Sequence, residues 1–193
     1  MVIPFNCKTV KVTSPFGERT LNGVKNTHKG YDLVGVESWE VCAVADGEVI
    51  QSRIITDRNN ATWQWGNYVC VKTTDGYLHY YCHLDSRNVK QGDKVKKGDK
   101  LGVMGNTGYS FGKHLHFEVR NGKTSISPET VLGIPNKTGT YKLVETTAKD
   151  RVKENVDVFV KKGWIKTPEY WYTHATDLEW LPELFDTIAK EVR

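Results

Sequence analysis

The sequence predicts a mainly β protein that ends in a small α-helical unit. Short runs rich in β-branched and aromatic residues fill most of the first two thirds of the 193-residue chain, and turn signals separate them. After about residue 147 the spacing of apolar residues changes to that of an amphipathic helix. Many short strands at this spacing are typical of a β-sandwich or a partly open barrel.

Five runs have the composition of strands: Glu40–Val44, Gly47–Ile50, Tyr68–Thr73, Leu78–His83 and Leu115–Arg120. Asp75-Gly76 lies between the third and the fourth run and predicts a tight hairpin there. The Lys-rich run from Lys90 to Lys100 is interrupted by Asp93 and Gly98, which predicts a second, solvent-exposed hairpin. No helical period is visible before residue 133.

The composition divides the chain into three parts. Residues 1–133 form the predicted β domain. Residues 134–147 contain Pro135, Asn136 and Gly139 among several threonines, which favours a linker with room for one short strand. Residues 148–193 form the predicted helical unit, which at that size has a marginal core of its own. We therefore expect it to pack on the β domain or on a second copy of the chain.

Three helical segments are expected after the linker. The first has an apolar face at Val152, Val156 and Phe159 and ends near Gly163. The second begins at Thr167-Pro168-Glu169, where Pro occupies the first helical position. The third has an apolar stripe made by Leu181, Leu184, Phe185, Ile188 and Val192.

Composition and charge exclude several functional classes. No stretch approaches the roughly 20 apolar residues of a membrane span. The formal charge of +4 is modest, and the sequence lacks the clustered basic and aromatic residues of a nucleic-acid-binding surface. None of the four cysteines lies in a C-x-x-C pair, so we expect free thiols rather than a zinc site; a Cys70–Cys82 bridge is the minor alternative.

The first residues lack the basic and apolar regions of a secretory signal peptide. This pattern favours a protein that stays in the cytoplasm or leaves the cell by a route that needs no signal.

Histidine spacing indicates a metal site. His114-Leu115-His116 lies in a strand-like run, where residues two apart point to the same face. His28 and Asp32 surround Gly30 in a loop that enters a strand. Nitrogen and oxygen ligands of this kind suit zinc, and three protein ligands with one open position are typical of a catalytic zinc site.

Each pattern is weak when taken alone. A single histidine is more often a hydrogen-bonded structural residue, and this is our interpretation of His174. His79 shares a strand face with Tyr81 and His83, so either a structural role or a place in a groove is open. The glycines that precede the H-x-H run, Gly105 and Gly108, are best explained by turn geometry.

Eight short motifs occur in a fixed order and resemble the lysostaphin/LytM-type zinc metallopeptidases, which are peptidoglycan endopeptidases. The motifs are Phe16-Gly17-x-Arg19, His28-x-Gly30-x-Asp32, Ala45-Asp46-Gly47-x-Val49, Gly66-Asn67, Tyr81-x-His83-Leu84, Gly92-Asp93-x-Val95-x-x-Gly98, Gly105-Asn106-Thr107-Gly108 and His114-Leu115-His116-Phe117-Glu118. They cover about residues 12–133 and imply a hybrid of β-sandwich and open barrel.

The resemblance assigns roles to five residues. It implies that His28, Asp32 and His116 bind Zn²⁺ and that His83 and His114 are the further active-site histidines. We expect His114 to act as general base or as proton donor to the leaving amine, and His83 to stabilise the oxyanion, although the two roles are interchangeable. Glu118 shares the strand face of His114 and His116, so it either orients an imidazole or has a structural role.

The expected function is therefore zinc-dependent hydrolysis of peptide bonds in bacterial peptidoglycan, in stem peptides or cross-bridges. One alternative is a carrier module of the biotinyl/lipoyl type, whose hairpins the segment Lys90–Asp99 resembles; a carrier has no need of Asp32. A second is a non-catalytic activator of wall hydrolases. That role normally accompanies lost ligands, and all five residues are present.

The helical unit and the missing signal suggest a biological setting. The segment Trp164–Trp171 is similar to a short C-terminal segment of some phage wall lysins. A phage endolysin released through a membrane lesion, or a lysin in the phage tail, would need no signal. The aromatic residues of this unit favour core packing over glycan stacking. Wall binding or homo-oligomerisation through these helices remains open.

Overall fold

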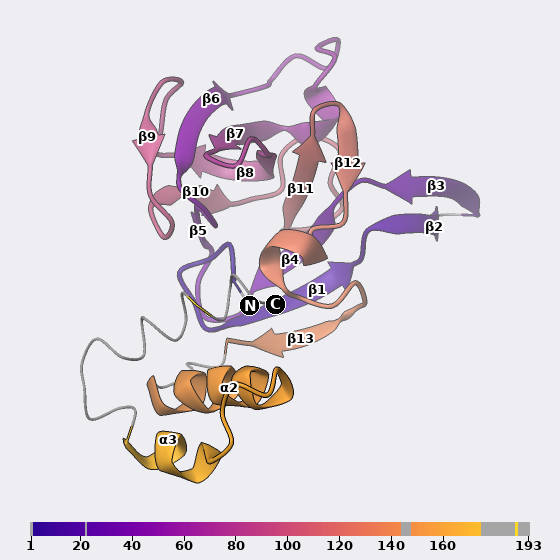
Figure 1. Ribbon diagram of the computed structural model, residues 1–193. Helices are drawn as coiled ribbons and strands as arrows, with labels where there is room; N and C mark the ends of the chain where they lie inside the picture. Colours follow the sequence, from indigo (N-terminus) through magenta and orange to yellow (C-terminus); the bar gives the residue numbers. More distant parts are fainter. Residues whose placement is uncertain (1, 22, 144–147, 175–187, 189–193) are drawn as a thin grey trace. The chain divides into compact units, whose positions relative to one another are not determined.

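The computed structural model describes residues 2–21, 23–143, 148–174 and 188. It divides the chain into two compact units, Met1–Leu143 and Val144–Arg193 (Figure 1). The first unit is built almost entirely from strands, whereas the described helices longer than one turn lie in the second. The predicted class, mainly β with a small C-terminal helical part, is confirmed.

The first unit contains an eleven-stranded sheet and a separate two-stranded hairpin. Its strands are β1 (Thr9–Ser14), β2 (Gly17–Leu21), β3 (Val24–His28), β4 (Tyr31–Gly35), β5 (Glu40–Cys42), β6 (Gly47–Arg53), β7 (Asn67–Thr73), β8 (Leu78–Arg87), β9 (Lys94–Val95), β10 (Lys100–Met104), β11 (Leu115–Asn121), β12 (Thr124–Ile126) and β13 (Gly139–Lys142). The main path of the sheet runs β13-β1-β4-β11-β8-β7-β6-β9, and β2 pairs with β3 alone. Figure 1 shows the β2-β3 hairpin projecting from the sheet beside β4.

Sequence patterns account for the central strands. Along β1, Val10 and Val12 are buried while Lys11 and Thr13 are exposed, which is the alternation of a strand with one covered face. The predicted hairpin at Asp75-Gly76 joins β7 to β8, which pair in antiparallel register. All five runs predicted as strands form strands, although β5 is shorter and β6, β7, β8 and β11 are longer than expected.

The core lies between the sheet's curled strands and includes buried tyrosines whose hydroxyl groups are hydrogen-bonded. The Tyr31 hydroxyl donates to the Ile134 carbonyl at 3.1 Å, and the Tyr81 hydroxyl accepts from the Val44 amide at 3.0 Å. Both partners matter because an unpaired buried hydroxyl destabilises a core. The four cysteines are free thiols, as expected, and Cys70 and Cys82 are fully buried.

The first unit extends ten residues beyond the predicted boundary at residue 133. Ile134 is fully buried in the core, and β13 pairs with β1 at the edge of the main sheet. Residues 134–143 are therefore part of the first unit, and only the end of the predicted 134–147 linker lies beyond it. A one-turn helix, α1 (Glu129–Leu132), precedes this segment; it is too short to produce a helical period.

The second unit contains α2 (Ala148–Lys161) and α3 (Pro168–His174), close to the first two predicted helices. Val152, Val156 and Phe159 are buried as one stripe along α2, as the sequence indicates. Gly163 has the positive φ of 73° that suits a glycine after a helix. Most of the third predicted stripe lies outside the described residues. No described helix is long and apolar enough to cross a bilayer.

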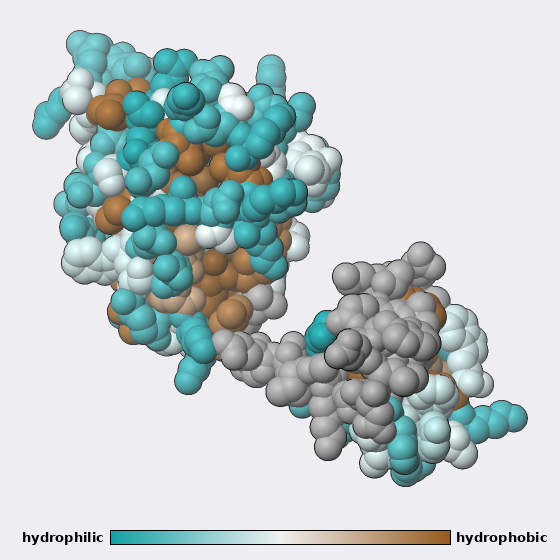
Figure 2. Space-filling model, turned by 90° about the vertical axis from the view of Figure 1, so that its left-hand side faces the viewer, coloured by the Kyte–Doolittle hydropathy of each residue, from teal (hydrophilic) through white to brown (hydrophobic). Residues whose placement is uncertain are grey.

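Most of the lysines in the run from Lys90 to Lys100 are exposed around β9, as the sequence predicted. The side of the first unit seen in Figure 2 is covered largely by hydrophilic side chains, with apolar atoms between them.

Candidate metal centre

Strand register brings two of the predicted ligands together. His116 on β11 lies directly opposite Asp32 on β4, and residues opposite each other in an antiparallel pair point to the same face. Asp32 in turn lies opposite Ser14 on β1. His28 ends β3, and the short turn before β4 carries it back over the same face. A pairing between residues 84 positions apart thus completes a cluster that local sequence only half defines.

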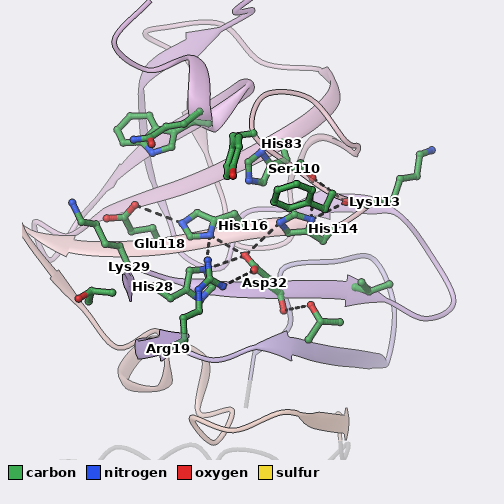
Figure 3. A pocket seen from close by; sticks show the side chains of 18 of the residues that line it. Arg19, His28, Lys29, Asp32, His83, Ser110, Lys113, His114, His116 and Glu118 are labelled. Atoms are coloured by element: carbon green, nitrogen blue, oxygen red, sulfur yellow. Dashed lines mark hydrogen bonds and ion pairs between the residues drawn. The ribbon is translucent and has the colours of Figure 1, made fainter. Parts of the chain in front are cut away.

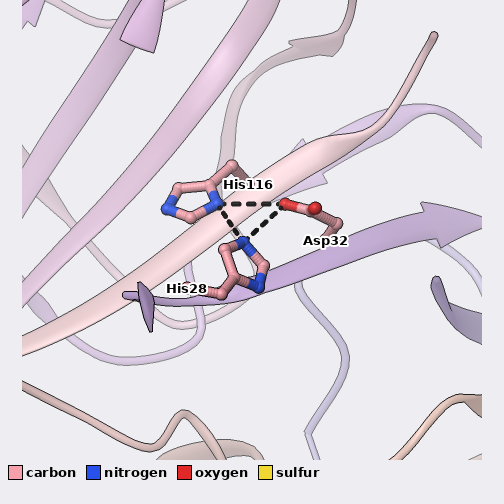
Figure 4. Close-up of side chains that lie close together, drawn as sticks. All are labelled: His28, Asp32 and His116. Carbon is pink, nitrogen blue, oxygen red and sulfur yellow. Dashed lines mark hydrogen bonds and ion pairs between the residues drawn. The ribbon is translucent and has the colours of Figure 1, made fainter. Parts of the chain in front are cut away.

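The three ligand atoms form a triangle with equal sides. Nε2 of His28, Oδ1 of Asp32 and Nδ1 of His116 are each 3.0 Å from the other two (Figure 4). The outer nitrogen of His28, Nδ1, lies 2.7 Å from the Pro15 carbonyl oxygen, to which it donates its hydrogen. That bond fixes the tautomer in which Nε2 carries a lone pair, as metal binding requires.

Gly30 allows the two ligand strands to approach. A Cβ atom at this position would lie 2.4 Å from the Phe117 carbonyl oxygen and 3.0 Å from Cε1 of His116. Any other residue would push the turn between His28 and Asp32 away from β11. The H-x-G-x-D spacing therefore has a steric reason as well as a chemical one.

Glu118 supports His116 from the side away from the cluster. Nε2 of His116 lies 3.7 Å from Oε2 of Glu118, whose side chain is 1% exposed. The other carboxylate oxygen accepts hydrogen bonds from Nε of Arg120 at 2.7 Å and from the Ser125 hydroxyl at 2.5 Å. Burial alone would raise the pKa of Glu118, but these three donors lower it to about 2. Glu118 is therefore an anion positioned to orient the His116 imidazole.

Asp32 is also held as an anion. Burial opposes its charge, but the imidazole nitrogens of His114, His116 and His28 that surround it outweigh burial and hold the pKa of the carboxyl well below its usual range. Its second oxygen, Oδ2, lies 3.4 Å from Nη1 of Arg19, which also donates to the Ser14 hydroxyl at 2.7 Å. The β2-β3 hairpin thus supplies a cation that fixes the carboxylate.

The two remaining predicted histidines face the cluster from the loop side of the groove. Nδ1 of His114 donates to the Gly112 carbonyl at 2.8 Å, and its Nε2 lies 3.4 Å from Oδ1 of Asp32. Nδ1 of His83 donates to the Thr107 carbonyl at 2.8 Å, and the two rings lie 4.7 Å apart between centroids. Burial is the main reason why the pKa of His83 falls to about 4, so its ring is neutral at pH 7.

His83 reaches the groove through an unusual backbone. Tyr81 and His79 on β8 lie opposite the core residues Phe117 and Val119, so simple alternation would place His83 on the core face. Instead His83 has a φ of 63°, the one positive value among the described non-glycine residues, and its ring lines the groove. Such a conformation is costly and concentrates at functional sites.

His79 does not line the groove. It is 2% exposed and packs edge-on against Phe117 at 5.6 Å, on the core face. The shared face that the sequence suggested for His79 and His83 ends where the backbone of His83 turns. His174 lies on α3 in the second unit and stacks on Tyr170 at 4.5 Å, in agreement with its structural interpretation.

The loop that holds His83 depends on two glycines. Gly66 and Gly108 both have positive φ, and a Cβ on Gly108 would lie 2.3 Å from the Gly66 amide nitrogen. This contact seats Thr107, whose hydroxyl accepts from the Asn67 amide and donates to the Leu84 carbonyl, both at 2.9 Å. Gly108 has the turn geometry that was expected, and its lack of a side chain also allows its backbone to approach that of Gly66. Asn67 therefore has a structural role here.

The cluster lies on the floor of an open groove of about 500 Å³ (Figure 3). All five predicted site residues line it, together with Arg19 of the first motif and residues that the sequence did not single out: Lys29, Trp65, Ser110, Phe111, Lys113 and Arg120. Tyr109 is also on the wall and is 57% exposed. A basic residue beside two of the four predicted histidines, Lys29 after His28 and Lys113 before His114, was the available sequence signal.

The donor set fits zinc. Two imidazole nitrogens and one carboxylate oxygen are ligands of the kind zinc prefers, and it binds them at about 2.0–2.2 Å. Three atoms 3.0 Å apart can all lie at that distance from a single ion. Among the described residues, these three side chains are the one group that could hold a metal ion in this way.

The sequence matches a family model and is similar to known proteins. The family model described as Peptidase family M23 matches residues 26–128, a segment that contains all five predicted site residues. The chain is 35% identical over 109 residues to the murein hydrolase activator NlpD of Escherichia coli, covering 56% of this chain and 27% of NlpD. It is 32% identical over 124 residues to the peptidoglycan DD-endopeptidase ShyC of Vibrio cholerae, covering 63% and 27%.

A solved structure shows the same fold. The catalytic domain of the antimicrobial peptidase lysostaphin from Staphylococcus simulans aligns with a TM-score of 0.54 and 29% identity, covering 67% of this chain and 94% of that domain. The chain spans about a third or less of the length of the curated relatives it matches.

Proposed function

The chain belongs to peptidase family M23, and we propose that it is a zinc-dependent endopeptidase that hydrolyses peptide bonds in bacterial peptidoglycan. The observation that carries the proposal is the equilateral triangle of His28, Asp32 and His116 with a pair of histidines directed at it. A structural metal site would fill every coordination position with protein, whereas this one opens onto a groove.

When bound, zinc would lower the pKa of a water ligand toward neutrality and polarise the scissile carbonyl group. The chain's own residues would then handle the proton. His83 and His114 each donate Nδ1–H to a backbone carbonyl, so each neutral ring offers the Nε2 lone pair to the groove. Either ring can accept the proton of the attacking water, and the protonated ring can donate it to the leaving nitrogen.

The geometry sharpens the expected division of roles. Stabilising an oxyanion requires an Nε2–H, which a ring with Nδ1 already donating has only when it is protonated. Because the pKa of His83 is lowered to about 4, His83 fits the role of acceptor better than that of oxyanion donor. His114, whose Nε2 lies 3.4 Å from Oδ1 of Asp32, is then the candidate for the group that passes the proton to the leaving nitrogen.

A second candidate is the activation of other wall hydrolases. The similarity to NlpD favours it, because NlpD is described as a murein hydrolase activator. The retained ligand triangle and histidine pair favour catalysis instead. The carrier alternative has no counterpart in the structure, since four histidines and a carboxylate converge where a carrier needs one modifiable side chain.

The test is digestion of purified peptidoglycan by the zinc-loaded chain, with and without a chelator, followed by mass analysis of the released fragments. We expect new peptide ends that vanish on chelation and return when zinc is restored. Cleavage that survives chelation, or intact wall in all samples, would contradict the proposal. An activator would instead leave wall intact alone and accelerate an added wall hydrolase.

The route to the wall and the role of the helical unit remain predictions. A phage endolysin or virion component was expected from the sequence, as was wall binding or self-association through the helices. Binding of the full chain to insoluble wall, and its sedimentation at several concentrations, would test the last two.

A further inference from the structure

The groove carries more positive charge than its acids balance. Its charged lining residues are Arg19, Lys29, Asp32, Lys113, Glu118 and Arg120. Arg19 lies 3.4 Å from Asp32, and Arg120 lies 2.7 Å from Glu118, so each acid already faces an arginine. Across the described part of the chain, no carboxylate forms an ion pair with Lys29 or Lys113. The exposed ammonium groups of Lys29 and Lys113 are therefore the positive charges of the groove that its two acids do not balance.

These two lysines flank the candidate reaction centre. Lys29 follows the ligand His28, and Lys113 precedes His114. Figure 3 shows them on opposite sides of the cluster formed by His28, Asp32 and His116. A peptide lying along the groove with its scissile bond over the metal site would therefore pass one lysine on each side of that bond.

The backbone and a ring contact limit where these charges can lie. Gly30 packs against the Phe117 carbonyl, which fixes the turn that carries Lys29. Nζ of Lys113 lies 4.3 Å from the centre of the Trp39 ring, a cation–π contact that restrains a long side chain. Restrained charges lose less entropy on binding a partner than free ones do.

Resting on the proposed peptidase function, we infer that the groove selects peptides with carboxylates on both sides of the scissile bond, and that Lys29 and Lys113 bind them. Stem peptides cross-linked through a diamino dicarboxylic acid have such carboxylates. Glycine cross-bridges have none beside the bond that is cut. The metal can attract an anion only at the reacting centre, whereas the lysines add attraction away from it.

The test compares two synthetic substrates with the same scissile bond. One is a peptide dimer cross-linked through a diamino acid with free carboxylates, and the other is the same dimer with those carboxylates amidated. For the zinc-loaded full chain we expect kcat/KM to be about tenfold higher on the free-carboxylate dimer. Added salt should reduce that ratio, because the contacts are solvent-exposed.

Variants assign the effect to the lysines. Lys29→Gln and Lys113→Gln should each lower the ratio between the two dimers about threefold, and the double variant should bring it close to one. Lys123→Gln removes an exposed lysine from the turn between β11 and β12, away from the groove, and should leave the ratio unchanged. Equal cleavage of both dimers by the wild-type chain, or lysine variants that keep the full ratio, would overturn the inference.

Binding separates this inference from the proposed function. If neither dimer is cut, the proposed peptidase activity fails, and calorimetric titration of both dimers into the full chain still tests the lysines. Tighter binding of the free-carboxylate dimer that is lost in the double variant supports them. Equal affinity for the two dimers would contradict them.

Discussion

Two groups of side chains meet in the groove, and the fold holds them in different ways. The metal-ligand group, His28, Asp32 and His116, lies on paired strands, and its outer atoms are held by the Pro15 carbonyl, Arg19 and Glu118. The rings of the histidine pair, His83 and His114, are held by hydrogen bonds to the carbonyls of Thr107 and Gly112 in the loop after β10, and His114 also has the Ser110 hydroxyl at 3.2 Å. The sheet thus fixes the candidate metal ligands, whereas a loop aims the two histidines that we propose handle the proton.

The comparison predicts that the two groups fail differently. Replacing His116 or Asp32 by Ala removes one of the three proposed ligands, and the two that remain should bind zinc too weakly to retain it. Bound zinc and wall cleavage should therefore both be lost. Metal analysis after gel filtration and digestion of purified wall measure the two effects. A His116→Ala chain that keeps both stoichiometric zinc and activity would show that the ligand set is wrong.

Replacing one of the histidine pair should spare the metal. His114→Ala and His83→Ala should retain zinc yet lower kcat by about 10²–10⁴-fold, the usual contribution of a positioned acid or base. The same metal analysis paired with initial rates on a soluble cross-linked peptide tests this. Loss of zinc from either variant would mean that the two groups are not separate.

A third variant examines what holds the metal-ligand group. Glu118→Gln keeps the size of the side chain but removes the negative charge that faces Nε2 of His116. We expect zinc affinity to fall about 10–100-fold, with activity recovering at saturating zinc. Competition with a chromogenic chelator measures the affinity, and Glu129→Gln, at the start of α1, is the matched control. An unchanged affinity would assign Glu118 a purely structural role beside Arg120.

The two groups also differ in how far the sequence could define them. Strand alternation placed His114 and His116 on one face, and a four-residue spacing joined His28 to Asp32. The contact between β4 and β11 links residues 84 apart, so the complete triangle required the resemblance to a family or the structure itself. His83 stood out in the sequence only as a histidine at the end of a strand, and the resemblance supplied its role, since alternation along β8 would point it into the core.

Long-range pairing also explains the misplaced boundary. Residues 134–143 have the Pro, Asn and Gly content of a linker, and nothing local shows that Ile134 enters the core or that β13 pairs with β1. The helices of the second unit are defined by contacts three and four residues apart, so the stripe on α2 was predicted almost without error. Local periodicity is visible in a sequence, whereas sheet edges are not.

His79 is a buried histidine that belongs to neither group, and it differs from both in its hydrogen bonding. Both ring nitrogens of His79 are buried without a hydrogen-bond partner in the described structure, unlike those of the site histidines. Burial, only weakly opposed by the Asp75 carboxylate, lowers the pKa of His79 from 6.5 to about 4. Below pH 6.5 the unfolded chain therefore binds a proton that the folded chain excludes, so stability falls as the pH drops from 6.5 to 4.

This histidine should affect stability rather than activity. The loss reaches roughly 3 kcal/mol in the free energy of unfolding by pH 4, from a shift of about 2.5 pKa units at about 1.4 kcal/mol each. His79→Phe, or His79→Leu if the larger ring strains the core, removes that loss while leaving zinc content and turnover at pH 7 unchanged. Urea unfolding at pH 7 and pH 4.5 measures it, with the exposed His174→Gln as control. An equal drop in wild type and both variants would assign the acid sensitivity to groups other than His79. The lowered pKa values of Asp32 and Glu118 cost stability only at lower pH, once the pH falls below the pKa values of these carboxyls in the unfolded chain.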